Sequence, residues 1–369
     1  MRVVIVGGGY AGMAVLISLR QSAVDVELHL IDPSPFHCKL THLQQTLRRP
    51  WVECRVALAD LAERFAFTHH RWALPIDSEQ LLQWQAQRRI RLPTGVLDFD
   101  YAVIATGSRP RAMPKGSDVY DQCDFLRQEG QDVLARYLER TRFQRRGINV
   151  VGAGPSGLQF LFELHGLLSE LGYDDRLRLI DGRTRLLPQL PEGFDRHLRQ
   201  RLAGAGIEYL PGTRYLGAHD GAIEVQDNSG KYRLTSSLTL LFPGVEPYPE
   251  ALRANRYGRL KVADRLLWNV FAAGDCVRFD GSGLNTLSAQ AAVRKGKQVA
   301  ENIKRVHQGR WPRLYAHPDR GFLVSLGPWD ALGWLLVPLN RVTGLSAFIA
   351  KEMVEKQWDL FLEGIDTYF

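Results

Sequence analysis

The sequence predicts an α/β fold in which one domain with a parallel sheet is inserted into another of the same kind. A strand, a glycine-rich turn and a helix open the chain at residues 2–22, and the same order returns at residues 147–172. Segments 98–110 and 269–279 are two later strands that each end in small residues, and we expect them to complete the first domain. With 369 residues, the chain is long enough for two or three domains with their own cores.

The first glycine-rich turn carries the spacing Gly-x-Gly-x-x-Gly at Gly7, Gly9 and Gly12, and Asp32 ends the next strand. In a Rossmann-like fold the first glycine permits the turn, and the second lets a pyrophosphate approach the backbone. The third lets helix and strand pack closely. The helix N-terminus offers free N–H groups to phosphates, and the acid accepts hydrogen bonds from a ribose. We therefore predict a dinucleotide site at these four residues.

The second turn repeats this pattern at Gly152, Gly154 and Gly157, and Asp181 ends the following strand. A carboxylate at this place favours the free ribose hydroxyl of NADH and repels the 2′-phosphate of NADPH. Two arginines, Arg183 and Arg185, follow closely and could offset that preference. The sequence therefore predicts a second dinucleotide site for NADH, with NADPH left open as an alternative.

Two further segments are predicted to lie close to a bound cofactor, because small residues let the chain pass near it. The residues are Ala105, Thr106 and Gly107 in the first segment, and Gly274 and Asp275 in the second. The predicted domain limits follow from these segments: residues 1–110 and 255–310 form one domain, residues 145–250 form the inserted domain, and residues 311–369 form a C-terminal region. The remaining stretch, 69–93, is predicted to be a short antiparallel meander.

Composition and charge narrow the class of protein. The net charge of +7 suits anionic cofactors, nucleic acid or an anionic membrane surface. The basic residues are dispersed without a zinc motif or an aromatic-interleaved stripe, so no nucleic-acid partner is predicted. The cysteines, Cys38, Cys54, Cys123 and Cys276, form no paired motif, so neither a metal site nor a redox dithiol is predicted. The sequence shows no signal peptide and no run of 18 apolar residues, so we expect a cytoplasmic protein.

With these motifs in place, residues 1–305 resemble the two-dinucleotide-binding-domain flavoproteins, the pyridine nucleotide-disulfide reductase superfamily. The resemblance implies FAD at the first glycine turn and NAD(P)H at the second. It also implies that Asp275 holds the ribityl chain of the flavin. Disulfide reductases of this superfamily carry a Cys-x-x-x-x-Cys motif after the first turn, and this sequence has none.

A closer resemblance is to type II NADH dehydrogenases. The segment "SAQAAVRKGKQVAENIKR" (288–305) is similar to a helix that begins beside the flavin and lines the quinone site in that family, with Ala289, Gln290, Gly296 and Asn302 at matching places. The segment "RGFLVSLGPWDALGWL" (320–335) is similar to a family strand that leads into a membrane-binding region. The resemblance implies a divergent, non-pumping FAD enzyme that passes electrons from NADH to a quinone, with Gln290 at the reaction site.

One departure from that family lies beside the second glycine turn. The family has Gly-x-Glu-x-x-x-Glu-Leu, whereas Gln159 replaces the first Glu here and Glu163 and Leu164 match. Because the family's Glu lies near nicotinamide and quinone, Gln159 is the second candidate catalytic residue. The replacement keeps two alternatives open: a soluble NAD(P)H-dependent flavoprotein reductase with a protein or small-molecule acceptor, and a redox-sensing flavoprotein. His37 and His42, in the loop after Asp32, are candidate proton relays or ordinary loop residues.

The C-terminal region is the expected place for membrane contact. A helical arrangement is predicted to place seven apolar residues near one face, with Lys351, Glu352, Glu355 and Lys356 elsewhere. The seven are Leu345, Phe348, Ile349, Met353, Trp358, Phe361 and Leu362. Such a helix could lie on the inner face of a plasma membrane as a peripheral contact, cover its own domain, or pair with a second copy in a homodimer.

Overall fold

Strand β1 (Arg2–Val6) lies inside a mostly parallel sheet of eight strands. Its Val and Ile side chains are buried on both faces, and such apolar strands favour the interior of a parallel sheet. The computed structural model describes residues 1–128, 130–141, 147–173, 175–250, 252–281, 285–316 and 319–368. The strand order of this sheet is β22 (Val277–Phe279), β19 (Leu252–Ala254), β20 (Arg259–Val262), β21 (Arg265–Ala272), β8 (Tyr101–Ile104), β1, β2 (Glu27–Ile31) and β5 (Phe67–His70).

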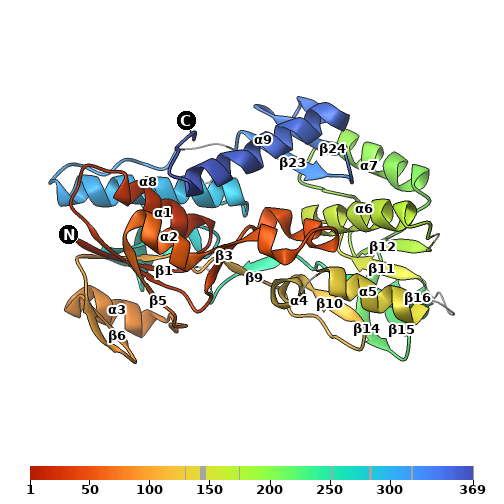
Figure 1. Cartoon of the computed structure of the whole chain (residues 1–369), viewed down its shortest axis with the longest axis horizontal. Coiled ribbons are helices and arrows are strands. Elements are labelled where there is room, and N and C mark those ends of the chain that lie inside the picture. Colours follow the sequence, from red (N-terminus) through yellow and green to blue (C-terminus); the bar gives the residue numbers. More distant parts are fainter. Residues whose placement is uncertain are drawn as a thin grey trace.

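A second sheet of five parallel strands occupies the other half of the molecule (Figure 1). Its order is β10 (Val119–Asp121), β17 (Leu238–Leu241), β11 (Ile148–Val151), β12 (Leu177–Asp181) and β13 (Glu208–Pro211). The two sheets confirm the predicted α/β class with two Rossmann-like units. Strands of the first sheet come from both ends of the predicted insertion, and on this distribution we propose the interrupted arrangement of domains.

Smaller sheets complete the architecture. They are the meander β14 (Arg214–His219), β15 (Ala222–Asp227) and β16 (Gly230–Thr235), the connecting pair β9 (Ser108–Pro110) and β18 (Val245–Pro247), the C-terminal sheet β23 (Gly321–Ser325), β24 (Ala331–Leu335) and β25 (Arg341–Thr343), and the hairpins β3 (Phe36–Cys38) with β4 (Arg55–Ala57) and β6 (Arg89–Leu92) with β7 (Gly95–Asp98). The pair β9–β18 joins the two large sheets.

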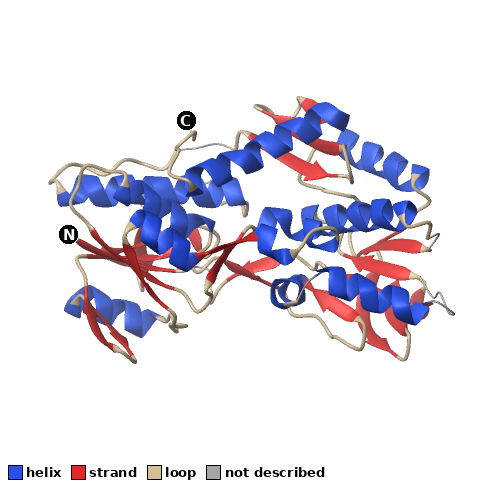
Figure 2. Ribbon diagram, in the orientation of Figure 1, coloured by secondary structure: helices blue, strands red, loops and turns tan. Residues whose placement is uncertain are grey.

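Helices cover both large sheets. They are α1 (Tyr10–Arg20), α2 (Leu58–Phe65), α3 (Ser78–Gln87), α4 (Gln122–Arg127), α5 (Gly130–Thr141), α6 (Pro155–Glu170), α7 (Glu192–Gly204), α8 (Ala289–His307) and α9 (Gly344–Leu362), with the 3₁₀ segments η1 (Leu40–Leu47) and η2 (Trp51–Cys54). Figure 2 shows α1 and α8 on one side of the first sheet and α3 on the other. No helix in the described parts of the chain has both the length and the apolar character needed to cross a bilayer.

Helices α1 and α8 pack closely because Gly296 carries no side chain. A Cβ on Gly296 would lie 2.5 Å from the carbonyl oxygen of Ala11 and 2.8 Å from the Cβ of Ala14. This contact packs α8, which follows the last strand of the first sheet in the chain, against the helix that follows the first glycine turn.

The prediction of a meander at residues 69–93 was wrong in its centre, where α3 forms. The side chain of Asp77 caps this helix by accepting a hydrogen bond from the backbone N–H of Gln80 at 2.8 Å. Leu81 and Trp84 are buried on one face of the helix, because residues three apart lie together. The N-cap at Asp77 and the helical spacing of the two buried side chains favour a helix here, although the residues on either side have the pattern of strands.

The predicted apolar face of α9 was also wrong. The buried residues of this helix are Ala347, Lys351, Glu355, Trp358, Phe361 and Leu362. Leu345, Ile349 and Met353 are at least half exposed. A helix turns about 100° per residue, so Ile349 and Trp358 lie on opposite faces. An ion pair between Lys351 and Glu355 lets both charges be buried, which apolar periodicity does not reveal.

Candidate active site

The first glycine turn is closely packed at its two outer glycines and open at the middle one. Gly7 has a φ of +109°, and a Cβ on it would lie 2.3 Å from the carbonyl oxygen of Ala105. A Cβ on Gly12 would lie 1.9 Å from the carbonyl oxygen of Gly7. A Cβ on Gly9 would meet no atom within 4 Å. The middle glycine therefore borders open space, where a phosphate group can approach the backbone.

The second glycine turn has the same geometry. Gly152 has a φ of +101°, and a Cβ on it would lie 2.0 Å from the carbonyl oxygen of Phe242. A Cβ on Gly157 would lie 1.9 Å from the carbonyl oxygen of Gly152, and one on Gly154 would meet nothing within 4 Å. Each turn thus packs its first glycine against a neighbouring strand end and leaves its second glycine free.

The helices that follow the turns begin without a competing side chain. Gly9 and Gly154 are the N-cap residues of α1 and α6, neither helix has a side-chain cap, and neither has an acid in its first turn. Backbone N–H groups at such helix ends attract anions. Together with the open middle glycines, these helix ends fit the phosphates of two dinucleotides.

The carboxylate of Asp32, at the end of β2, is held by backbone N–H groups. Its carboxylate accepts hydrogen bonds from the backbone N–H groups of Gly8, at 2.6 Å, and Ser34, at 2.7 Å. Burial raises the pKa of Asp32. The acid is therefore fixed beside the first glycine turn, as a ribose acceptor requires.

Asp181, at the end of β12, is held differently. It accepts a hydrogen bond from the backbone N–H of Ala153 at 2.6 Å, and the guanidinium of Arg183 donates to both of its oxygens, at 2.9 and 2.8 Å. Burial acts to raise the pKa of Asp181, but the hydrogen bonds from Arg183 and Ala153 outweigh it and lower the pKa. A ribose must share this carboxylate with a cation, so NADPH stays an open alternative here.

Two segments from later in the chain meet the start of α1. Ser108 donates a hydrogen bond to the carboxylate of Asp275 at 3.1 Å, which links the segment after β8 to the segment after β21. A Cβ on Gly274 would lie 2.8 Å from the Cβ of Ala11. The structure thus gathers Gly7, Gly9, Gly12, Asp32, Ala105, Thr106, Gly107, Gly274 and Asp275 around one helix end. Their contacts with a cofactor stay a prediction.

The two candidate catalytic residues lie on different helices. Gln159 is half-buried on α6, where its side-chain oxygen accepts a long hydrogen bond from the backbone N–H of Ser325, at 3.4 Å. It also lines a small cavity together with Leu40, Leu43 and Phe242. Gln290 is half-buried in the first turn of α8. Their catalytic roles stay predictions.

A partly buried ionic cluster, which sequence reasoning missed, lies between η1, α6 and α9. Arg48 bridges the buried Glu163 and the exposed Glu170 of α6. Burial raises the pKa of Glu163, against the opposing effect of Arg48. An acid within the apolar face of α6 was the signal, since buried charges are paired in folded proteins.

The α9 side of this cluster contains the second buried acid. Glu355 pairs with Lys351, one turn away, and with His42 of η1 at 3.4 Å. Lys39 pairs with Asp359 at 2.8 Å. Burial raises the pKa of Glu355 and, together with the charge of Lys351, lowers the pKa of His42 to about 4. We call the set Lys39, His42, Arg48, Glu163, Lys351, Glu355 and Asp359 the junction cluster.

His37, the other candidate relay, is fully buried. Its Nδ1 lies 2.8 Å from the carbonyl oxygen of Gly8, and its Nε2 accepts a hydrogen bond from the indole N–H of Trp358 at 3.0 Å. Both ring nitrogens are therefore engaged within the protein, which favours a structural role for this histidine.

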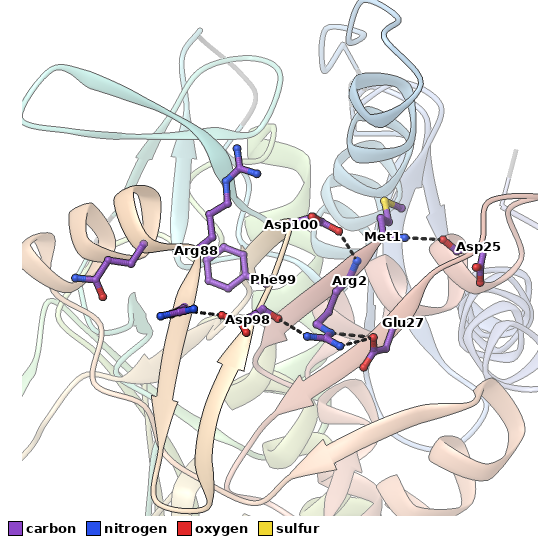
Figure 3. A pocket seen from close by; sticks show the side chains of 10 residues that line it. Met1, Arg2, Asp25, Glu27, Arg88, Asp98, Phe99 and Asp100 are labelled. Carbon is purple, nitrogen blue, oxygen red and sulfur yellow. Dashed lines mark hydrogen bonds and ion pairs between the residues drawn. The ribbon is translucent and has the colours of Figure 1, made fainter.

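A separate pocket of about 550 Å³ lies at the opposite edge of the first sheet, where β1 and β2 begin (Figure 3). Four of its charged side chains form ion pairs: Arg2 contacts Glu27 at 2.8 Å, and Arg89 contacts Asp98 at 2.7 Å. Ligands of open parallel sheets bind at the carboxyl ends of the strands, which is where Gly7 and Asp32 lie. The candidate active site is therefore at the glycine turns.

Comparisons with known proteins agree with this arrangement. The model of the pyridine nucleotide-disulphide oxidoreductase family matches residues 1–296. A curated type II NADH:quinone oxidoreductase of Staphylococcus aureus is 24% identical over 100% of this chain and 97% of its own length.

Solved structures show the same fold. A sulfide:quinone oxidoreductase from Aquifex aeolicus has a TM-score of 0.78 at 17% identity, covering 99% of this chain and 92% of that one. NDH2 from Plasmodium falciparum, in complex with NADH, has a TM-score of 0.77 at 14% identity, covering 96% and 94%.

The chain belongs to the pyridine nucleotide-disulphide oxidoreductase family. It is an NAD(P)H-dependent flavoprotein oxidoreductase, and the predicted resemblance and enzyme class are confirmed. Its four cysteines are free thiols, so no disulfide stands beside the first glycine turn.

Proposed function

We propose that this protein oxidises NADH through FAD and passes the electrons to a quinone beside the junction cluster. FAD lies at the first glycine turn and NADH at the second. The observation that carries the proposal is that two open glycine turns occur together with two buried acids, Glu163 on α6 and Glu355 on α9. The full-length similarity to a type II NADH:quinone oxidoreductase supports the quinone as acceptor.

The residues of the chain have distinct tasks in this reaction. FAD supplies the two-electron chemistry when it is bound. Gly154 leaves room for the pyrophosphate of NADH, Gly152 and Gly157 allow the close packing of the turn, and Asp181 orients the ribose. Hydride transfer then depends chiefly on close positioning, which these contacts provide. Gln290 and Gln159 can hydrogen-bond a quinone carbonyl, but neither amide can donate a net proton.

The two protons that a reduced quinone takes up need ionisable groups. Glu163 and Glu355 are both buried, and burial raises the pKa of each. A buried carboxyl group can take up and release a proton when burial opposes the ion pair that favours its charged form. After the proton has left, Arg48 stabilises the carboxylate of Glu163, and Lys351 stabilises that of Glu355. We therefore assign proton delivery to the junction cluster.

We propose peripheral attachment to the cytoplasmic face of a membrane through an exposed apolar surface. It comprises Trp329, Leu336, Val337, Leu339, Leu345, Ile349 and Met353, each at least half exposed. Isolated exposed apolar residues are ordinary, but an apolar group on one helix and the adjacent hairpin marks an interaction surface. A quinone dissolved in lipid would reach the junction cluster from this side.

Acceptor specificity tests the proposed function. Steady-state NADH oxidation is measured with a short-chain quinone, which takes up protons, and with ferricyanide, which takes up electrons alone. Glu163→Gln and Glu355→Gln should slow the quinone reaction about 100-fold and leave the ferricyanide reaction unchanged. Glu170→Gln is the control, because Glu170 pairs with the same Arg48 but is exposed. Equal losses with both acceptors would contradict proton delivery by this cluster.

Failure with every quinone, together with rapid ferricyanide reduction, would instead support a soluble reductase with another acceptor.

Sedimentation with anionic lipid vesicles tests the membrane surface. The double variant Ile349→Ser/Met353→Ser should lose vesicle binding, whereas Val96→Ser, which changes an exposed valine of β7, should keep it. Binding that is equal in all three proteins would overturn the proposed surface, and dimerisation that only the double variant loses would assign it to a second copy.

A further inference from the structure

The C-terminal helix reaches the first glycine turn through two buried hydrogen bonds. The indole N–H of Trp358, on α9, donates to Nε2 of His37 at 3.0 Å. Nδ1 of His37 lies 2.8 Å from the carbonyl oxygen of Gly8 and donates to it. The N–H of Gly8 in turn donates to Asp32 at 2.6 Å. A continuous chain therefore joins α9 to the turn and the acid of the first dinucleotide site.

The two bonds require one protonation state of His37. A carbonyl oxygen only accepts, so Nδ1 must carry the proton, and Nε2 must be free to accept from Trp358. Burial lowers the pKa of His37 to about 4, so the ring is neutral near neutral pH. The ring is also fully buried, so bulk solvent does not reach either hydrogen bond.

Ring packing strengthens the contact. Tyr10 is the first residue of α1, and its ring lies 4.8 Å from that of Trp358 and 5.3 Å from that of His37. The rings of His37 and Trp358 are 5.4 Å apart. The hydroxyl of Tyr10 contacts that of Thr41 at 3.1 Å. The three rings thus cover the start of the helix whose free N–H groups face the dinucleotide phosphates.

The end of the chain is fastened to the same domain by further contacts. Arg64 donates to the carbonyl oxygen of Leu362 at 2.8 Å, and Gln21 donates to that of Gly364 at 2.6 Å. Figure 1 shows α9 running from the C-terminal sheet toward α1. The same helix packs on β23, β24 and β25 of the C-terminal sheet. The helix is therefore anchored at both ends, which holds Trp358 in place.

We propose that α9 retains FAD: Trp358, acting through His37, fixes the backbone of the Gly7–Gly9 turn in the conformation that holds the FAD pyrophosphate. Both are positioning residues, and their effect is on how slowly FAD leaves. This inference rests on the proposed placement of FAD at the first glycine turn. A preorganised turn binds more tightly because its ordering cost is met during folding.

A double-mutant cycle on FAD dissociation tests the proposal. The holoprotein is diluted, and the rise of flavin fluorescence reports release. Trp358→Phe keeps a ring against Tyr10 and removes the N–H donor. His37→Asn keeps a donor near Gly8 and removes the acceptor for Trp358. Each should accelerate FAD release about tenfold, and because both break the same link, the double variant should release FAD no faster than either single variant.

Two controls separate this proposal from simpler explanations. Trp329→Phe removes the N–H of an exposed tryptophan that packs on Phe348 of α9, and it should leave FAD release unchanged. Single effects that multiply to about 100-fold in the double variant would show independent structural damage and overturn the link. Wild-type release from Trp358→Phe would also overturn it.

The placement of FAD itself is tested by Gly9→Ala, whose methyl group would enter the open space at the first turn. Loss of FAD from Gly9→Ala, with wild-type release from Trp358→Phe, would reject only the role of α9. Full FAD content in Gly9→Ala would instead reject the proposed placement.

Discussion

The two glycine turns of this chain are built alike but enclosed differently. In both, the first glycine packs against a neighbouring strand end, the third packs against the first, and the second is open. At the first turn, Asp32 accepts hydrogen bonds from backbone N–H groups, and the buried ring of Trp358 on α9 packs against Tyr10 at the helix start. At the second, Asp181 is paired with Arg183, whose side chain is half exposed.

This difference matches two kinds of ligand. A cofactor that stays bound through many turnovers benefits from a turn that is fixed and covered. A substrate that must enter and leave in every cycle needs a turn that solvent can reach. The same motif therefore serves retention or exchange, according to what the rest of the chain places over it.

The largest changes in ligand binding should come from substitution of the middle glycines. Each substitution should affect the ligand of its own turn and leave the other turn unchanged. Gly9→Ala and Gly154→Ala introduce a methyl group that meets no protein atom within 4 Å, so both variants should fold. Gly9→Ala should weaken FAD binding about 10- to 100-fold, the cost of one badly placed methyl group. Gly154→Ala should keep its FAD and raise the KM for NADH by a similar factor. Flavin content and NADH titrations measure both, and identical defects in the two variants would break the comparison.

A smaller effect is expected from the ion pair at the second acid. Asp181→Ala should weaken NADH about tenfold, because a ribose loses a charged acceptor, and should improve NADPH by freeing Arg183. Arg183→Ala should weaken NADPH and leave NADH at least as tight as before. Ratios of kcat/KM for the two nucleotides report this exchange. If both variants leave the ratio unchanged, Asp181 does not read the ribose.

The covered site should contribute to the pH dependence of stability through His37. The folded-state pKa of His37 is about 4, below that of an unfolded histidine. The unfolded chain therefore binds more protons between these values, and stability falls as pH decreases through that window. His37 should account for about 2 kcal/mol of loss between pH 6.5 and pH 4.5. Urea unfolding of wild type and His37→Asn measures this loss, and equal slopes in the two proteins would contradict it.

Sequence patterns predicted the parts of the fold that depend on local repeats. The strands before Gly7 and Gly152, the helices after them and the acids at positions 32 and 181 all lie where the motif places them. These elements follow from rules that act within a few residues, namely turn sterics, helix ends and alternating burial.

Contacts between distant segments were beyond that reasoning. Lys351 and Glu355 face inward although they are charged, because they pair with each other, and Glu355 also contacts His42, more than 300 positions away. The sequence alone is consistent with His37 as an ordinary loop histidine. Only the structure shows that Trp358 donates a hydrogen bond to it. Apolar periodicity cannot detect a face that is buried through ion pairs, so the role of α9 emerged only from the structure.

Anaerobic stopped-flow absorbance of the holoprotein tests the central claim most directly, that one turn holds FAD while the other admits NADH for electron transfer to a quinone. NADH should bleach the flavin absorbance within the time of one turnover, and a short-chain quinone should then restore it. Flavin that stays oxidised with NADH would contradict a nucleotide site at the second turn. Flavin that is bleached but not reoxidised by any quinone would contradict the proposed acceptor.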